Sequence, residues 1–86
     1  MQRPEFGPII RLVNAAWPQT LGWPTSQWDT WYAELERYPA SLVEYVLRAA
    51  TSRDFPPSPF DVAATCSEHV RRWNRQAALR AGVSAW

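Results

Sequence analysis

The chain has 86 residues, a length that suits one domain with a single hydrophobic core. Hydrophobic residues make up 47% of it and charged residues 20%, which excludes an intrinsically disordered chain. The formal net charge of +1 excludes a strong overall field for nucleic acid but not a local basic patch.

The N-terminal third predicts one helix followed by a connector. After loose residues 1–4, apolar side chains recur at three- and four-residue spacing from Phe6 to Val13. Pro8 fits only the first turn of a helix, so we expect this helix to begin near Gly7 and to run for about ten residues. Two Trp-Pro steps around Gly22 then predict a turn-rich connector over residues 17–25.

Two further helices are predicted before the centre of the chain. The second covers residues 26–37, and the third follows the Tyr38-Pro39 step and runs to about Ser52. Each has an apolar stripe with helical spacing. The stripes consist of Trp28, Trp31, Tyr32 and Leu35 in the second helix and of Leu42, Val43, Val46, Leu47 and Ala50 in the third.

A proline corner separates the third helix from the last. Pro56 and Pro57 lack backbone donors and force extended conformations, so the preceding helix must stop before them. Ser58 then caps a new helix whose first residue is Pro59. Phe55 is the large apolar side chain of this stiff segment, and we expect it to point inward.

The last helix is predicted from Pro59 to Arg80, with Gly82 as its terminator and residues 83–86 as a tail. The pattern indicates an all-α fold, a compact four-helix domain over residues 1–86 with loose ends at 1–4 and 82–86. The expected core comprises Ile9, Val13, Trp31, Leu35, Leu42, Val46, Leu47, Phe55, Val62 and Trp73.

Chemistry-bearing motifs are scarce. Cys66 and His69 stand three residues apart on one predicted helix, but a lone cysteine on an apolar stripe is typical of a core residue. Neither a zinc-ligand set nor a glycine-rich phosphate loop is present in the sequence. We therefore expect no catalytic activity, no cofactor and no metal.

Two groups of residues are candidates for partner binding. One is a basic strip on the last helix, which either contacts phosphates or an acidic partner or is a solvated helix face. This strip consists of Arg71, Arg72, Arg75 and Arg80. The other group is Trp17 and Trp23, which either anchor a partner from the connector or fold back as a lid over the core. With six tryptophans in so small a chain, we expect one or two to face solvent or a partner.

The order of several motifs resembles the N-terminal domain of the phage replicative-helicase loader/inhibitor family. The resemblance covers about residues 6–75. The residues that carry it are Trp31, Leu35, Tyr38-Pro39, Val43, Leu47, Phe55-Pro56-Pro57-Ser58-Pro59 and Asp61-Val62.

The resemblance implies a small phage-encoded adaptor that binds a replicative DNA helicase and controls its loading or activity, without catalytic residues. Family members contact the helicase through a mobile C-terminal segment, whereas only six residues follow Arg80 here. An inhibitor of another host or defence protein and a DNA-binding module are the alternatives. The single cysteine and the absence of a signal or membrane-spanning pattern favour the cytoplasm of the infected bacterium.

Overall fold

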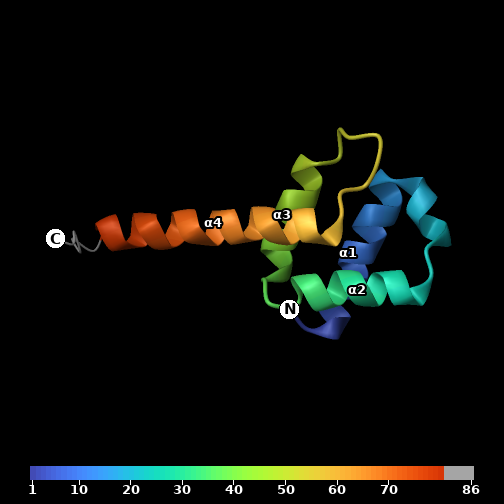
Figure 1. The fold of residues 1–86 in the computed structure, drawn as a ribbon, viewed down its shortest axis with the longest axis horizontal. Coiled ribbons are helices and arrows are strands. Elements are labelled where there is room, and N and C mark those ends of the chain that lie inside the picture. The colour runs from blue at the N-terminus through green and yellow to red at the C-terminus, as the bar shows by residue number, and fades with distance from the viewer. Residues whose placement is uncertain (81–86) are drawn as a thin grey trace.

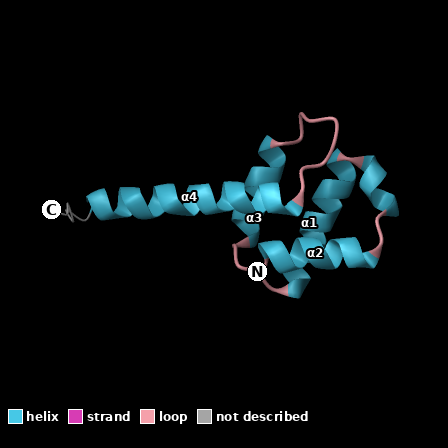
Figure 2. Ribbon diagram, viewed as in Figure 1, coloured by secondary structure: helices cyan, strands magenta, loops and turns pink. Residues whose placement is uncertain are grey.

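Every helix of the protein begins at or beside a proline. The computed structural model describes residues 1–80, and within them it is all-α, with no strand (Figures 1 and 2). The elements are α1 (Arg3–Ala16), the short 3-10 helix η1 (Pro18–Gly22), α2 (Thr25–Leu35), α3 (Ala40–Ala49) and α4 (Pro59–Arg80). Proline suits these starts because its fixed φ is helical and its missing N–H would be unpaired there anyway. The predicted terminator Gly82 and the tail 83–86 lie outside the described residues.

The start of α1 differs from the prediction. The helix begins at Arg3 and includes Pro8, and residues 1–4 are not loose. The backbone N–H of Gln2 donates to Oε1 of Glu5 (2.8 Å), and the terminal amino group of Met1 donates to the carbonyl of Glu36 (2.6 Å). These bonds order the first turn. Pro8 has no N–H to donate to the carbonyl of Pro4, but both prolines are exposed, so water can reach that carbonyl.

The core lies where the three short helices meet the first half of α4. α1 packs against α3, and both α2 and α3 pack against α4. The buried hydrophobic side chains are Phe6, Ile9, Val13, Trp17, Trp31, Leu35, Leu42, Val43, Val46, Leu47, Val62 and Cys66. Of the predicted core, all but Phe55 and Trp73 are buried, so the helical stripes are confirmed.

The prediction for Phe55 is wrong, because its side chain is 76% exposed. Pro57 is the buried residue of the corner, and the indole of Trp17 reaches the same segment from the connector. Nε1 of Trp17 donates to the carbonyl of Arg53 (2.9 Å), and Nε2 of Gln19 donates to the carbonyl of Asp54 (3.1 Å). The connector therefore holds the corner from within through Trp17, while the Phe55 ring points into solvent.

The prediction of a compact domain is also wrong, because α4 continues beyond its neighbours. It has 22 residues, about 33 Å of helix, whereas α2 and α3 have 11 and 10 residues. Residues 71–80, here called the protruding segment, are all exposed, and Trp73 is 54% exposed. The molecule is accordingly elongated, with principal extents of 52 × 26 × 18 Å (Figure 1). We call residues 1–70 the body.

The different burial of Trp17 and Phe55 can be tested by replacing each side chain with alanine. We expect Trp17→Ala to lower the free energy of unfolding by about 3–5 kcal/mol, because it removes a fully buried ring and its hydrogen bond to Arg53. Phe55→Ala should change that free energy by less than about 0.5 kcal/mol, because the ring is in solvent. Urea denaturation of both variants measures the difference, and equal losses would contradict this account of the corner.

Candidate protein-interaction surface

An aromatic hollow lies at the point where α4 leaves the body. It has a volume of about 300 Å³ and is lined by Ser41, Leu42 and Tyr45 of α3 and by His69 and Trp73 of α4. Positions three and four apart share a helix face, which brings each set together. The Tyr45 and His69 rings meet edge to face with centroids 5.5 Å apart, and the His69 and Trp73 centroids are 6.5 Å apart.

The aromatic hollow is notable because its large side chains are in solvent. Tyr45 is 62% exposed and Trp73 is 54% exposed. Exposed aromatic side chains that meet at one place are typical of contact sites for other proteins, since they offer large apolar area with few torsions to immobilise. His69, between them, is half-buried and supplies ring nitrogens for hydrogen bonds.

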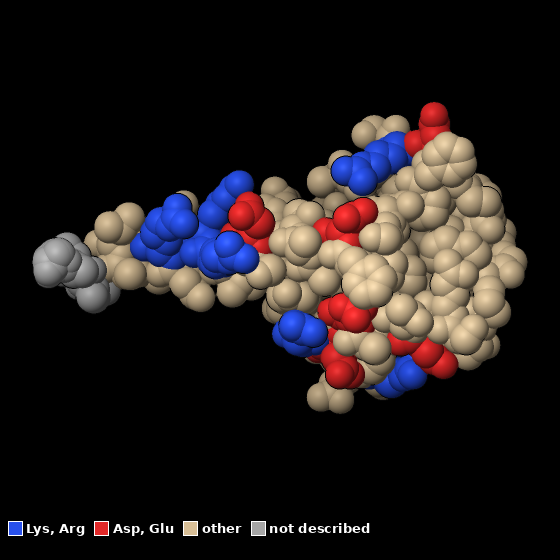
Figure 3. Space-filling model, in the orientation of Figure 1, with Lys and Arg blue, Asp and Glu red and all other residues tan. Residues whose placement is uncertain are grey.

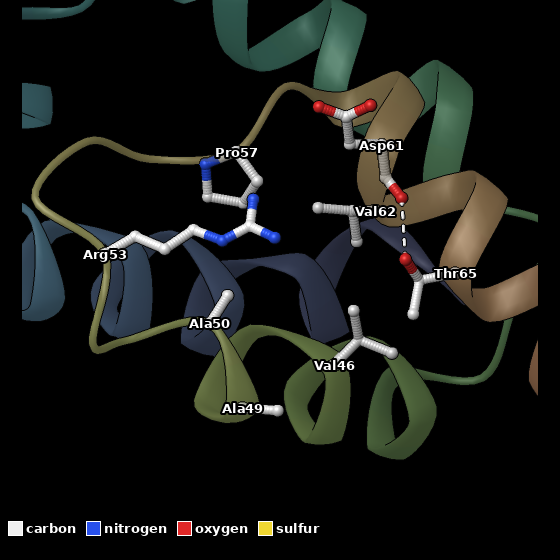
Figure 4. Close-up of a pocket in the computed structure, with 8 residues that line it drawn as sticks. All are labelled: Val46, Ala49, Ala50, Arg53, Pro57, Asp61, Val62 and Thr65. Carbon is white, nitrogen blue, oxygen red and sulfur yellow. Dashed lines mark hydrogen bonds between the residues drawn. The ribbon is translucent and has the colours of Figure 1, made fainter.

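A second hollow, the corner hollow, lies beneath the proline corner and has a volume of about 170 Å³. Its lining is drawn in Figure 4, where the guanidinium of Arg53 extends between Pro57 and Ala50 toward Val62. Asp61 is on its other wall and is held by helix capping, because its backbone N–H donates to Oγ of Ser58 (3.1 Å). The predicted Ser58 cap is thereby confirmed. The hollow joins an apolar floor to one positive and one negative side chain.

A third hollow, the middle hollow, shares one lining residue with each of the other two. It has a volume of about 220 Å³ and is lined by Ala64, Thr65, Glu68, His69 and Arg72. Thr65 also lines the corner hollow, and His69 also lines the aromatic hollow. Each of the three is at or below the lower end of the volumes typical of small-molecule sites, so they suit individual side chains of a partner.

The four candidate arginines all lie on the protruding segment, and all are exposed. Residues 71–80 contain no acidic residue, so this segment carries four positive charges, whereas the body has five arginines against eight carboxylates, a net charge of −3. Figure 3 shows the same separation. The ion pair found within residues 1–80 joins Arg3 to Asp29 (3.0 Å), so none of the protruding arginines is within ion-pair distance of an Asp or Glu carboxylate in that range.

The two candidate tryptophans of the connector belong to the core instead. Trp17 is 1% exposed, so the alternative in which it anchors a partner from the surface is wrong. Trp23 is half-buried and packs against Trp28 and Trp31, with ring centroids 5.0 and 5.9 Å away. The structure therefore favours the alternative in which both rings fold back and cover the core. Of the tryptophans it describes, Trp73 is the one that faces solvent, as expected for one or two of them.

Sequence reasoning missed Tyr45, the largest exposed side chain of α3. The ring lies outside the apolar stripe of that helix, on the exposed side that also carries Ser41 and Arg48. An aromatic residue at a polar position of an amphipathic helix is the signal that identifies it. Its proximity to His69 and Trp73 was not readable from the sequence, because it depends on how α3 and α4 pack.

Cys66 and His69 do not form a reactive pair. Cys66 is fully buried, and loss of hydration raises the pKa of its thiol from the usual 9.0 to about 11. The thiol is therefore neutral near pH 7 and unsuited to nucleophilic attack, which confirms its prediction as a core residue. Residues 1–80 include no group of three or more His, Cys, Asp or Glu side chains placed to hold a metal ion.

Comparison with known proteins assigns no family to this chain. No family model, no curated protein and no solved structure matches it. Within the described part of the chain, no helix has both the length and the apolar character needed to cross a membrane.

The buried thiol predicts a specific loss of stability at high pH. Above about pH 9 the unfolded chain releases the Cys66 proton while the folded protein keeps it up to about pH 11. The stability contributed by the protonated thiol is complete below pH 9 and is lost as the pH rises, by up to about 3 kcal/mol. Urea denaturation between roughly pH 8 and pH 11 measures this loss. Cys66→Ala should flatten this part of the profile, and an unchanged slope would contradict the assignment to Cys66.

Proposed function

We propose that the protein is a small non-enzymatic adaptor that binds a protein partner through the aromatic hollow. The observation that carries the proposal is the meeting of Tyr45 and Trp73, each more than half exposed, around His69 at the base of the protruding segment. A partner that covers the aromatic hollow removes two aromatic rings from water and fills a hollow of side-chain size.

The physical setting supports this use. Tyr45 and Trp73 stand on helices whose buried faces are anchored in the body, so their positions are largely set before a partner arrives. Preorganisation of this kind reduces the entropy cost of binding. Tyrosine and tryptophan are also the residues most enriched among those that dominate interface energies.

For the identity of the partner, we propose a replication protein, with a replicative DNA helicase as the first candidate to test. The support is the resemblance of residues 6–75 to the phage loader/inhibitor family described above. Under this proposal the phage-encoded adaptor controls the loading or the activity of the helicase in the host cytoplasm. The alternative partner is another host or defence protein that the chain inhibits, and it would use the same hollow.

Single substitutions test the aromatic hollow. The immobilised protein is incubated with purified replicative helicase and, in parallel, with host lysate analysed by mass spectrometry. We expect Tyr45→Ala and Trp73→Ala each to reduce partner retention about tenfold or more, as loss of a central aromatic contact does. Both side chains are exposed, so the melting temperature should change little.

Phe55→Ala is the matched control, because it removes an exposed aromatic ring outside the aromatic hollow. It should retain the partner as the wild type does. Failure to recover any replication protein counts against the helicase. A partner that binds both hollow variants normally would show that the hollow is not the contact surface.

Direct binding of nucleic acid is the second candidate. It is favoured by the four exposed arginines of the protruding segment, with Trp73 available to stack on a base. Phosphate contacts require affinity to fall with salt by about one logarithmic unit per contact, and Arg75→Gln should reduce that slope by about one. Fluorescence anisotropy with labelled single- and double-stranded DNA measures it, and no binding at low salt would exclude this function.

A further inference from the structure

One side of α4 is exposed to solvent along the whole described length of the helix. Over residues 60–70 the exposed positions of α4 fall, at 100° per residue, within an arc of about 140°, and we call this arc, continued to Arg80, the outer face of α4. In the body it contains Phe60, Asp61, Ala64, Thr65 and Glu68, all exposed. In the protruding segment it contains Arg71, Arg72, Arg75, Ala78 and Leu79, also exposed. The buried residues Val62 and Cys66 lie on the opposite side of the helix.

Apolar, acidic and basic side chains occupy different parts of the outer face. Phe60 is 60% exposed near its first end, and Leu79 is 66% exposed near its last, about 28 Å away along the helix axis. The acidic residues Asp61 and Glu68 lie in its first half, and its basic residues lie in the second. The two halves are thus complementary to each other in charge, and each has an apolar side chain at its outer end.

We propose that two copies of the chain pair in an antiparallel manner along the outer face of α4. The protruding segment of each copy then lies on the body of the other, about a two-fold axis near Val70. Residues opposite one another have numbers that sum to about 140. In this register Arg72 faces Glu68 of the second copy, and Leu79 faces Phe60 and Asp61 of the second copy.

Charge complementarity favours a second copy of the chain as the partner, and it favours the antiparallel over the parallel arrangement of the two helices. The protruding segment carries +4 and the body −3, so each copy offers what the other lacks. A parallel pairing would place arginine against arginine and Glu68 against Glu68, which is unfavourable. The antiparallel pairing makes every contact twice, as a two-fold interface requires.

The shape of the outer face agrees with this register. The middle hollow, at Ala64, Thr65 and Glu68, lies opposite the segment of the second copy that carries Arg72 and Arg75. A volume of about 220 Å³ accommodates a long side chain, and the hollow has a carboxylate on its wall. Tyr45 and Trp73 lie to one side of this interface, so the dimer presents two aromatic hollows and does not depend on the proposed adaptor function.

Charge reversal tests the Glu68–Arg72 contact. Sedimentation equilibrium over increasing protein concentration should show a dimer for the wild-type chain. Glu68→Arg and Arg72→Glu each place like charges opposite one another twice, and we expect each to raise the dimer dissociation constant about tenfold or more. When the two single variants are mixed, both contacts become complementary again, so a heterodimer should form with an affinity near that of the wild type.

The controls change charge elsewhere. Glu36→Arg and Arg37→Glu alter the net charge by the same amounts at exposed positions after α2, and they should leave the dimer unchanged. Phe60→Ala and Leu79→Ala should weaken the dimer without altering the charge. Circular dichroism shows that each variant remains folded, which is expected because all six side chains are exposed.

Three results would overturn the proposal. The first is a wild-type chain that stays monomeric up to roughly 1 mM, the limit of a weak interaction; if the same arginines then bind DNA, phosphate is the occupant of this face. The second is a dimer whose mass does not respond to charge reversal at Glu68 or Arg72. The third is a mixture of the two reversed variants that fails to pair, which excludes the antiparallel register.

Discussion

The structure depends on the buried indole of Trp17. The ring is at the C-terminal end of α1, yet its N–H reaches 36 residues along the chain to the carbonyl of Arg53. The carbonyl lies in the corner that precedes α4, and it satisfies the N–H of a buried indole, which would be costly to leave without a partner. With Gln19 bonded to Asp54 one step further on, the connector and the corner are fixed to each other. That attachment holds the segment that leads into α4 against the connector.

The length of α4 then determines which surfaces the protein exposes. A body made of helices with 10 to 14 residues covers only the first half of a 22-residue helix. The remaining residues extend into solvent with four arginines and Trp73 on them. Where the helix leaves the body, its neighbour α3 contributes Tyr45, and the aromatic hollow results. Exposure of this kind stabilises nothing in an isolated monomer, because apolar area left in water contributes no burial free energy.

The two surfaces of α4 allow two kinds of interaction on one rigid element. The aromatic hollow combines apolar rings with a histidine, which suits a protein partner. The outer face is organised by charge, which suits a copy of itself. Because the two surfaces occupy different sides of the helix, neither interaction would obstruct the other. A two-fold dimer would carry two aromatic hollows and could engage a partner that has more than one subunit, with the gain in avidity that paired sites provide.

The sequence by itself determined the helical class, the position of α4 from Pro59 to Arg80, the Ser58 cap and the buried stripes from Ile9 to Val62. These features depend on interactions between residues a few positions apart, such as helical periodicity and proline geometry, which a sequence displays directly. Only the tertiary structure decided that Trp17 is buried while Phe55 and Trp73 are exposed. All three are large apolar residues at plausible core positions. Their burial depends on how far the neighbouring helices extend along α4 and on which ring packs against the corner. The spacing of residues along the sequence contains no information about either.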